Sequence, residues 1–390
     1  MTILAPDPGA RLATRTALGF SPGQSEYLDA LRGVAAQLVL VQHLLATCFP
    51  ASGFDDYGLG ALGVLTFFLL SGFLITDSVA ARVETGRYSL TEFIVSRFSR
   101  IYTPLIPALL LVAALDWFSS KTTHYEFARD YNWPTALANL LMLQDFPLFQ
   151  VLRRLHVPDQ AWFTKSFGSG RQFWTISIEW WIYVTVGIGT AIALARRASL
   201  GLLAVLAFAA ITSLYNLVGG PGDSLTLFWL FGAGAAFAYR RFGRPLSAAG
   251  WIGLVGLLAV LAAVRLFFTH GRVYEAVFAL LFCGLLLAPM FGRPGQHPAR
   301  ILRLFRLDWL SYSSYSLYLT HGSIVVLLAS VWPEWTAGLR GMILLILITN
   351  VAAVIFAALF EAPHRAVRRW LLARLTADAA IPAKSRLPIR

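Results

Sequence analysis

Residues 28–43 read LDALRGVAAQLVLVQH, an apolar stretch with an arginine near its start and a histidine at its end. If this stretch is an α-helix, the eleven positions from Arg32 to His43 make three turns and about 20°, so both side chains lie on one face, about 16 Å apart. An ionisable residue inside a membrane span indicates a function by default. The structural alternatives are an Arg32 side chain that reaches the lipid headgroups and a neutral His43 that bonds a neighbouring helix.

The composition indicates that most of this chain lies in lipid. Of its 390 residues, 57% are hydrophobic and 13% are charged, whereas soluble domains have about 25% charged residues. Apolar runs of bilayer-spanning length recur along the chain and lack the alternation of barrel strands, so they must be helices. We therefore predict an all-α fold, a polytopic membrane helical bundle of about ten transmembrane helices. The predicted spans cover 28–48, 59–79, 101–118, 173–194, 200–217, 224–239, 250–268, 274–291, 311–331 and 342–360.

The chain has a net charge of +12, and its basic residues are distributed as the predicted topology requires. With both termini inside, most arginines fall in the inner segments and the C-terminal tail, which is the positive-inside pattern. The basic balance therefore favours anionic lipid over nucleic acid as a partner. The expected location is multi-pass in a bacterial cytoplasmic (inner) membrane, with both termini cytoplasmic.

The expected organisation is one membrane domain, 28–361, between a polar cytoplasmic N-terminal tail, 1–27, and a basic cytoplasmic C-terminal tail, 362–390. The domain contains an outer insertion, 119–172, whose apolar TALANLLML is too short to cross and is expected to be interfacial or re-entrant. The aromatic residues of the insertion fit a membrane interface or a sugar-stacking surface. The tail segment HRAVRRWLLARL is typical of a short amphipathic helix on the inner leaflet.

Polar residues recur inside other predicted spans. The second span contains FFLLSGFLIT with Ser71, and the fourth contains FWTISIEWWIYV, in which Glu179 and Tyr183 share a helix face. The ninth contains SYSSYSLYLTH, in which Tyr318 and His321 belong to one polar stripe. Such groups form a binding site or bond one helix to another.

SRFSR places Arg97 and Arg100 on one helix face at the inner mouth of the third span. Two arginines at this spacing suit polyanionic phosphates, although charges at a cytosolic interface need no special explanation. Cys48 and Cys283 lie in or beside different spans and imply no disulfide framework. The histidines lack paired ligand spacing, so we expect no metal site.

These motifs together resemble the acyltransferase 3 family of integral-membrane acyltransferases. LDALRGVAAQLVLVQH is similar to the Arg-x10-His signature of that family, GVLTFFLLSGFLIT to its second-span motif, and SRFSR to its Arg-x-x-Arg element. WTISIEWWIYV resembles its WSLSVE-type segment, SYSLYLTH its penultimate span and EAPHR its terminal ExPxR. The six motifs occur in the order of the family.

The resemblance implies transfer of an acyl group from cytosolic acyl-CoA, most commonly acetyl-CoA, to a hydroxyl of a glycan, a lipid-linked sugar or a small molecule. His43 is the expected catalytic general base, with transient acylation of this residue as the second route. Arg32 is expected to orient the donor or to stabilise developing negative charge, and Arg97 and Arg100 to hold the phosphates of CoA. The expected substrate-binding residues are Ser71, Glu179, Tyr183, Tyr318 and His321.

The chain departs from the family pattern at two positions. Leu65 stands where many members have an acidic residue, and Trp180 stands where a second carboxylate often follows the glutamate. The C-terminal hydrolase-like domain of some members is also missing from the sequence, so we expect the chain to work alone or with separate partners. A homodimer and glycan-synthesis partners both fit this expectation.

Two other classes of function compete with the enzyme. Buried His, Arg and Glu could serve a membrane transporter or exporter of a glycan or metabolite, although no internal repeat of the transporter kind is evident. A structural subunit of a glycan-assembly complex would tolerate alanine at the polar positions. The sequence leaves open the acceptor, the choice of acetyl or succinyl, and the oligomeric state.

Overall fold

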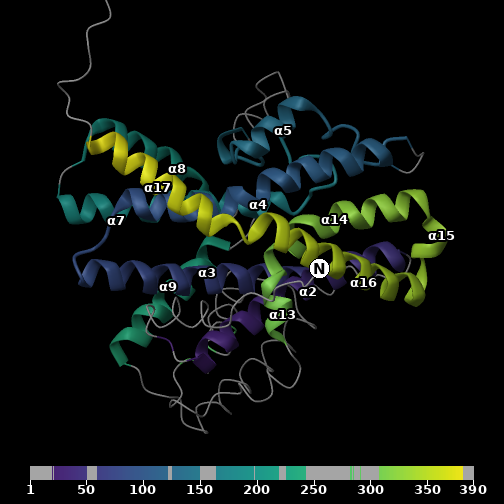
Figure 1. The fold of residues 1–390 in the computed structure, drawn as a ribbon, viewed down its shortest axis with the longest axis horizontal. Helices are drawn as coiled ribbons and strands as arrows, with labels where there is room; N and C mark the ends of the chain where they lie inside the picture. The colour runs from purple at the N-terminus through teal and green to yellow at the C-terminus, as the bar shows by residue number, and fades with distance from the viewer. Residues whose placement is uncertain are drawn as a thin grey trace, which may run out of the picture. The chain divides into compact units, whose positions relative to one another are not determined.

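The computed structural model describes residues 20, 22–50, 59–121, 125–149, 164–196, 198–218, 225–242, 282, 284, 290 and 307–380. The chain divides into two compact units, one from residues 1–88 and 213–315 and the other from 89–212 and 316–390. Within the described ranges, every regular element is a helix (Figure 1).

The first unit is organised around α3. It comprises α2 (Pro22–Cys48), α3 (Leu59–Glu84), α9 (Leu225–Phe242) and α13 (Leu307–Tyr312). α2 packs on α3 and on α13, and α3 packs on α9. Buried apolar side chains fill the α3–α9 contact, where the Phe20 and Phe73 rings stack with centroids 5.8 Å apart.

Two glycines bring α3 and α9 together at the backbone. A Cβ atom on Gly72 would lie 1.9 Å from the carbonyl oxygen of Trp229, and one on Gly232 would lie 2.0 Å from that of Leu69. Small residues allow this close approach in membrane bundles. At the end of the pair, Arg240 Nη1 contacts Asp77 Oδ1 at 2.8 Å, and Arg240 also pairs with Glu84.

The second unit contains α4, a 30-residue helix that starts after an N-cap at Ser89, whose hydroxyl accepts a hydrogen bond from Glu92 N. Such caps satisfy a donor that a helix start leaves open. Both α4–α7 and α4–α17 are packed pairs. The helices of this unit are α4 (Leu90–Ser119), α5 (Trp133–Leu140), α7 (Phe173–Ala195), most of α8 (Leu200–Val218) and of α14 (Ser314–Val331), α15 (Pro333–Thr336), α16 (Gly338–Phe356), the π-helix η5 (Ala357–Glu361) and α17 (His364–Ala380).

Seven helices of the described residues are long and apolar enough to cross a membrane. They are α2, α3, α4, α7, α8, α14 and the segment Gly338–Leu375, which starts with α16. The predicted all-α polytopic bundle is therefore confirmed, and the chain is a multi-pass integral membrane protein. The predicted span 224–239 corresponds to α9, which is helical but is not among the seven. The spans 250–268 and 274–291 fall almost wholly outside the described residues, so the total of about ten stays a prediction.

Candidate functional site

Arg32 and His43 lie on one uninterrupted helix. α2 runs from Pro22 to Cys48 without a break, so the two side chains are separated by about 20° around the axis and about 16 Å along it. Both are half-buried. Thr47 donates a hydrogen bond of 2.8 Å to the backbone carbonyl of His43, so the helix is also regular beyond the histidine.

Close contacts hold this part of α2 against α3. The Oε1 atom of Gln42, the neighbour of His43, accepts hydrogen bonds from the first backbone N–H groups of α3, at 2.9 Å from Leu59 and 3.4 Å from Gly60. One turn further, a Cβ on Gly63 would lie 2.5 Å from the carbonyl oxygen of Ala35. The backbone that carries the histidine is therefore fixed, as a catalytic group requires.

Ser71, a predicted substrate-binding residue, has a partner within the first unit. The indole Nε1 of Trp229 donates to Ser71 Oγ at 3.2 Å. This bond joins α3 to α9 beside the close contact at Gly72. Polar groups commonly link membrane helices in this way, and substrate binding by Ser71 stays a prediction.

The remaining predicted site residues belong to the second unit, where α4 and α7 bring three of them together. The guanidinium carbon of Arg97 lies 5.8 Å from the ring centroid of Tyr183 and 5.9 Å from that of Phe93, within the range of cation–π contacts. The Tyr183 hydroxyl donates a short hydrogen bond to Glu179 Oε1, the i, i+4 neighbour expected from the sequence. A cation, a phenol and a carboxylate thus form one cluster.

Arg100 lies one turn from Arg97 and has a different environment. Its Nη1 atom is 3.0 Å from Glu361 Oε1, and the other oxygen of Glu361 accepts a hydrogen bond of 2.7 Å from Ser316. Glu361 is 6% exposed and ends the π-helix η5. π-Helical turns inside α-helices are frequent at functional sites. Here the turn joins three chain segments through one carboxylate.

Tyr318 contacts the start of α7, and His321 is buried on the same helix as Tyr318, α14. The Tyr318 hydroxyl lies 2.5 Å from Thr175 Oγ1 and donates to the carbonyl oxygen of Gln172 at 3.3 Å. His321 is 1% exposed, and its Nδ1 atom is 2.8 Å from the carbonyl oxygen of Leu317. A carbonyl oxygen only accepts, so Nδ1 carries a hydrogen and donates it to this oxygen.

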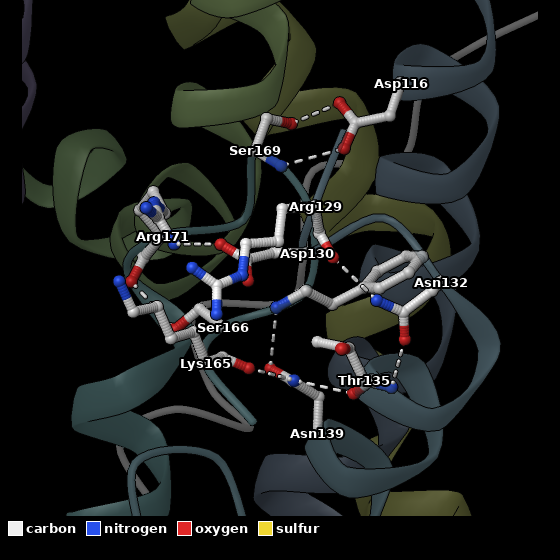
Figure 2. A network of polar contacts seen from close by, with 11 residues as sticks. Asp116, Arg129, Asp130, Asn132, Thr135, Asn139, Lys165, Ser166, Ser169 and Arg171 are labelled. Atoms are coloured by element: carbon white, nitrogen blue, oxygen red, sulfur yellow. Dashed lines mark hydrogen bonds and ion pairs between the residues drawn. The ribbon is translucent and has the colours of Figure 1, made fainter. Parts of the chain in front are cut away.

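The sequence analysis overlooked a second polar network, which Figure 2 shows around Asp116 and Ser169. Asp116 is fully buried near the end of α4 and accepts hydrogen bonds from Ser169 N at 2.8 Å and Ser169 Oγ at 2.5 Å. Ser169 also bonds Ser323 of α14 at 2.7 Å. An aspartate inside the apolar run ALLLVAALDWF was the signal that could have found this network.

Gly168 makes the Asp116 contact sterically feasible. Its φ is +51°, and a Cβ there would lie 2.0 Å from Asp116 Oδ2. Nearby, burial raises the pKa of the Tyr125 phenol, and the Asp116 carboxylate raises it further. The phenol therefore stays protonated at neutral pH.

The described residues contain no group of three or more His, Cys, Asp or Glu that could hold a metal ion. Cys48 is buried and is not in a disulfide, while Cys283 lies outside the described residues.

Most of this chain matches the sequence profile of a known family. The sequence profile of the acyltransferase 3 family, described as an acyltransferase domain, matches residues 25–362. The chain belongs to the acyltransferase 3 family. The match runs from the start of α2 to the residue after Glu361, so it covers the candidate residues of both units.

Two named proteins are distant relatives of this chain. The chain is 25% identical over 372 residues to the O-acetyltransferase OatA of Staphylococcus aureus (strain NCTC 8325 / PS 47), covering 89% of this chain and 58% of that protein. It is 27% identical over 173 residues to the O-acetyl transferase of Shigella phage Sf6, which covers 43% of this chain and 46% of the relative. The chain thus spans little more than half the length of the staphylococcal relative. No solved structure matches it.

Proposed function

We propose that this protein is a membrane O-acyltransferase that moves an acyl group from acyl-CoA to a hydroxyl of a glycan, a lipid-linked sugar or a related small molecule. Acetyl is the favoured acyl group because two relatives are named O-acetyl transferases. The proposed location is a bacterial cytoplasmic membrane, with the donor on the cytoplasmic side, where most of the basic residues are expected.

One observation carries this proposal. The family match spans residues 25–362 and includes α2, on which an arginine and a histidine share one face of an unbroken, half-buried helix. A histidine has an ordinary pKa near 6.5, so it can accept and return a proton at neutral pH.

The proposed reaction uses His43 as the general base. One imidazole nitrogen takes the proton from the acceptor hydroxyl while the oxygen attacks the carbonyl carbon of the thioester. The tetrahedral intermediate then collapses, the C–S bond breaks, and the imidazolium returns its proton to the CoA thiolate. The products are the O-acyl ester and free CoA. Arg32 stabilises the negative charge on the thioester oxygen or orients the donor. Acyl transfer through His43 itself is the alternative route.

In the second unit, the two arginines of SRFSR have different contacts, which supports different roles for them in binding the donor. Glu361 already balances the charge of Arg100 at 3.0 Å. Arg97 contacts the rings of Tyr183 and Phe93 and also donates a hydrogen bond of 3.1 Å to Ser96 Oγ. We therefore assign the phosphates of CoA chiefly to Arg97 and give Arg100 a smaller share. Glu179, Tyr183, Tyr318 and His321 are proposed to bind the acceptor.

Radiolabelled acetyl-CoA tests the proposal. Purified protein in vesicles, supplied with membrane extract from producing cells, should move the label to a product that releases acetate in mild alkali, as O-acetyl esters do. Heat-treated protein is the control. A protein that neither binds CoA nor moves the label, but changes the distribution of a glycan across the vesicle membrane, would be a transporter instead.

A further inference from the structure

α4, α5 and Phe167 enclose an apolar groove in the second unit. Its volume is about 490 Å³, within the range of small-molecule pockets, about 300–1,000 Å³. Leu109 and Phe167 are buried and form the floor, whereas Leu110 and Leu137 are 68% and 43% exposed and form the rim. The groove is therefore open to the surroundings of the helices along one side.

The part of α4 that lines the groove falls within the predicted membrane span 101–118, so we expect the groove to lie in hydrocarbon. Ile106 and Ala113, which mark its limits on α4, precede the helix end at Ser119 by about 20 Å and about 9 Å at 1.5 Å per residue. Half of a hydrocarbon core is about 15 Å thick. A water molecule finds few hydrogen-bond partners in an apolar groove at that depth, so water is not the expected occupant. The occupant that the lining fits is an aliphatic chain.

Hydrogen bonds preform the walls of this groove. The Tyr131 hydroxyl donates to the carbonyl oxygen of Ala113 at 2.8 Å, which fixes the chain before α5 to α4. The buried Asn139 of α5 donates to the carbonyl of Lys165 at 2.9 Å and accepts from Phe167 N at 3.1 Å. Figure 2 shows Asn139 between Thr135 and Lys165. The groove therefore needs no rearrangement before a chain enters, which lowers the cost of binding.

The segment that forms the floor continues directly into a polar cluster at the start of α7 and on α14, which consists of Ser169, Gln172, Thr175, Tyr318 and Ser323. Two residues after Phe167, Ser169 bonds Ser323, and Gln172 Nε2 donates to the carbonyl oxygen of Leu319 at 2.7 Å. Gln172 is 3% exposed, and its Oε1 atom has no hydrogen-bond partner among the described residues. A buried acceptor without a donor is costly, and a hydroxyl group of a ligand would satisfy it.

We propose that the groove binds the aliphatic chain of a lipid-anchored acceptor, which enters sideways from the bilayer with its hydroxylated head directed to the segment 167–172. This inference rests on the proposed function and narrows the acceptor from any hydroxyl compound to an amphiphile. The groove holds the chain, and the polar cluster of α7 and α14 receives the head.

Photo-cross-linking in lipid nanodiscs tests the site with a defined probe. Dodecyl β-D-glucoside with a diazirine in its chain should label residues 106–113 and 133–140 of the full-length protein, and unlabelled dodecyl glucoside should compete. Ala136 lies in the groove and is half-buried, so Ala136→Trp should reduce labelling about tenfold, equivalent to about 1.4 kcal/mol. Ala204→Trp, at an exposed alanine of α8, is the matched control and should label normally.

Three results would overturn the inference: no labelling in the groove, labelling unaffected by Ala136→Trp, or equal labelling by a diazirine phosphatidylcholine that dodecyl glucoside does not displace. The last result would identify an ordinary bilayer lipid. Transfer from acetyl-CoA separates this inference from the proposed function. Ala136→Trp should slow transfer to dodecyl glucoside but leave transfer to methyl glucoside unchanged. A wild-type protein that acetylates neither glucoside and no membrane extract argues against the function, while the labelling pattern still decides the groove.

Discussion

At the scale of single residues, the ion pair of Arg100 and Glu361 changes the role that we expect for Arg100. The two groups are 3.0 Å apart, and the carboxylate side chain is 7% exposed. Removing one partner of such a pair leaves the other charge desolvated and unpaired, which costs more than the pair contributes. The main effect of Arg100 is therefore expected on stability.

Arg100→Ala should lower the free energy of unfolding by about 1–3 kcal/mol, since the arginine is partly exposed and the full buried-pair cost of about 3–5 kcal/mol does not apply. Thermal unfolding in detergent measures this change. Combining Arg100→Ala with Glu361→Gln should recover most of the loss, because the unpaired charge is then removed. A double variant less stable than Arg100→Ala alone would contradict the assignment.

Arg97→Ala should act on the donor. If its guanidinium binds the phosphates of CoA, the KM for acetyl-CoA should rise about tenfold with little change in kcat, as expected for a group that binds substrate and transition state equally. Arg97→Lys keeps the charge and should lose less. An unchanged KM in Arg97→Ala would remove this residue from the donor site.

Asp145 should make stability depend on pH. Burial raises its pKa from 3.8 to about 6, while Lys165 and Arg171 lower it in part and Asp130 raises it. The folded state therefore holds the proton more tightly than the unfolded state, so stability rises as the pH falls through about 6 towards 3.8.

Asp145→Asn removes the charge and keeps a residue that tolerates the observed φ of +52°. It should raise the melting temperature at pH 8, by a free energy of at most about 3 kcal/mol, and the gain should disappear near pH 4. A gain that is equal at both pH values would show that the ionisation of Asp145 is not its cause.

At the scale of elements, the contact of α3 with α9 depends on glycine. Gly232→Ala would place a Cβ 2.0 Å from the carbonyl oxygen of Leu69, so the helices must separate, and we expect a loss of about 2 kcal/mol or more. Gly234→Ala is the matched control on the same helix, since a Cβ there meets nothing within 4 Å among the described residues. It should be neutral or stabilising by about 0.5–1 kcal/mol. Thermal unfolding of both variants shows whether a loss of stability in Gly232→Ala comes from the helix contact or from the change of glycine to alanine in a helix.

The sequence predicts the spanning helices well because each is set by a local property, the length of an apolar run. It does not predict contacts between helices. Asp77 lies inside the predicted span 59–79 with no sign of its partner, and Arg240 is simply an inner-side arginine in the sequence, yet the two are 2.8 Å apart. The same holds for Asp116 and Ser169, which are 53 residues apart in the chain.

The candidate site, like the fold, is predictable only where a contact joins residues that are close in the sequence. The i, i+4 pair Glu179 and Tyr183 is found as expected, because it depends only on helix geometry. Thr175 and Gln172 were missed because their importance comes from Tyr318, which is more than 140 residues away in the chain. No single-sequence pattern encodes such a pairing.

At the scale of the whole molecule, the helical membrane fold is confirmed and the acyl-transfer chemistry is proposed. The chain is a multi-pass membrane protein of the acyltransferase 3 family. Arg32, His43 and Ser71 belong to one compact unit, and the other proposed site residues belong to the second. The donor role proposed for Arg97 and the proton transfer proposed for His43 therefore concern residues of different units, and both stay predictions.

The most direct test is the rate at which His43→Ala moves label from radiolabelled acetyl-CoA. Loss of a general base costs about 10²–10⁴-fold in rate, so the variant should be nearly inactive while its melting temperature and its insertion in the membrane match those of the wild type. Arg32→Lys should keep part of the activity. A correctly folded His43→Ala protein that transfers acetyl groups at the wild-type rate would contradict the account.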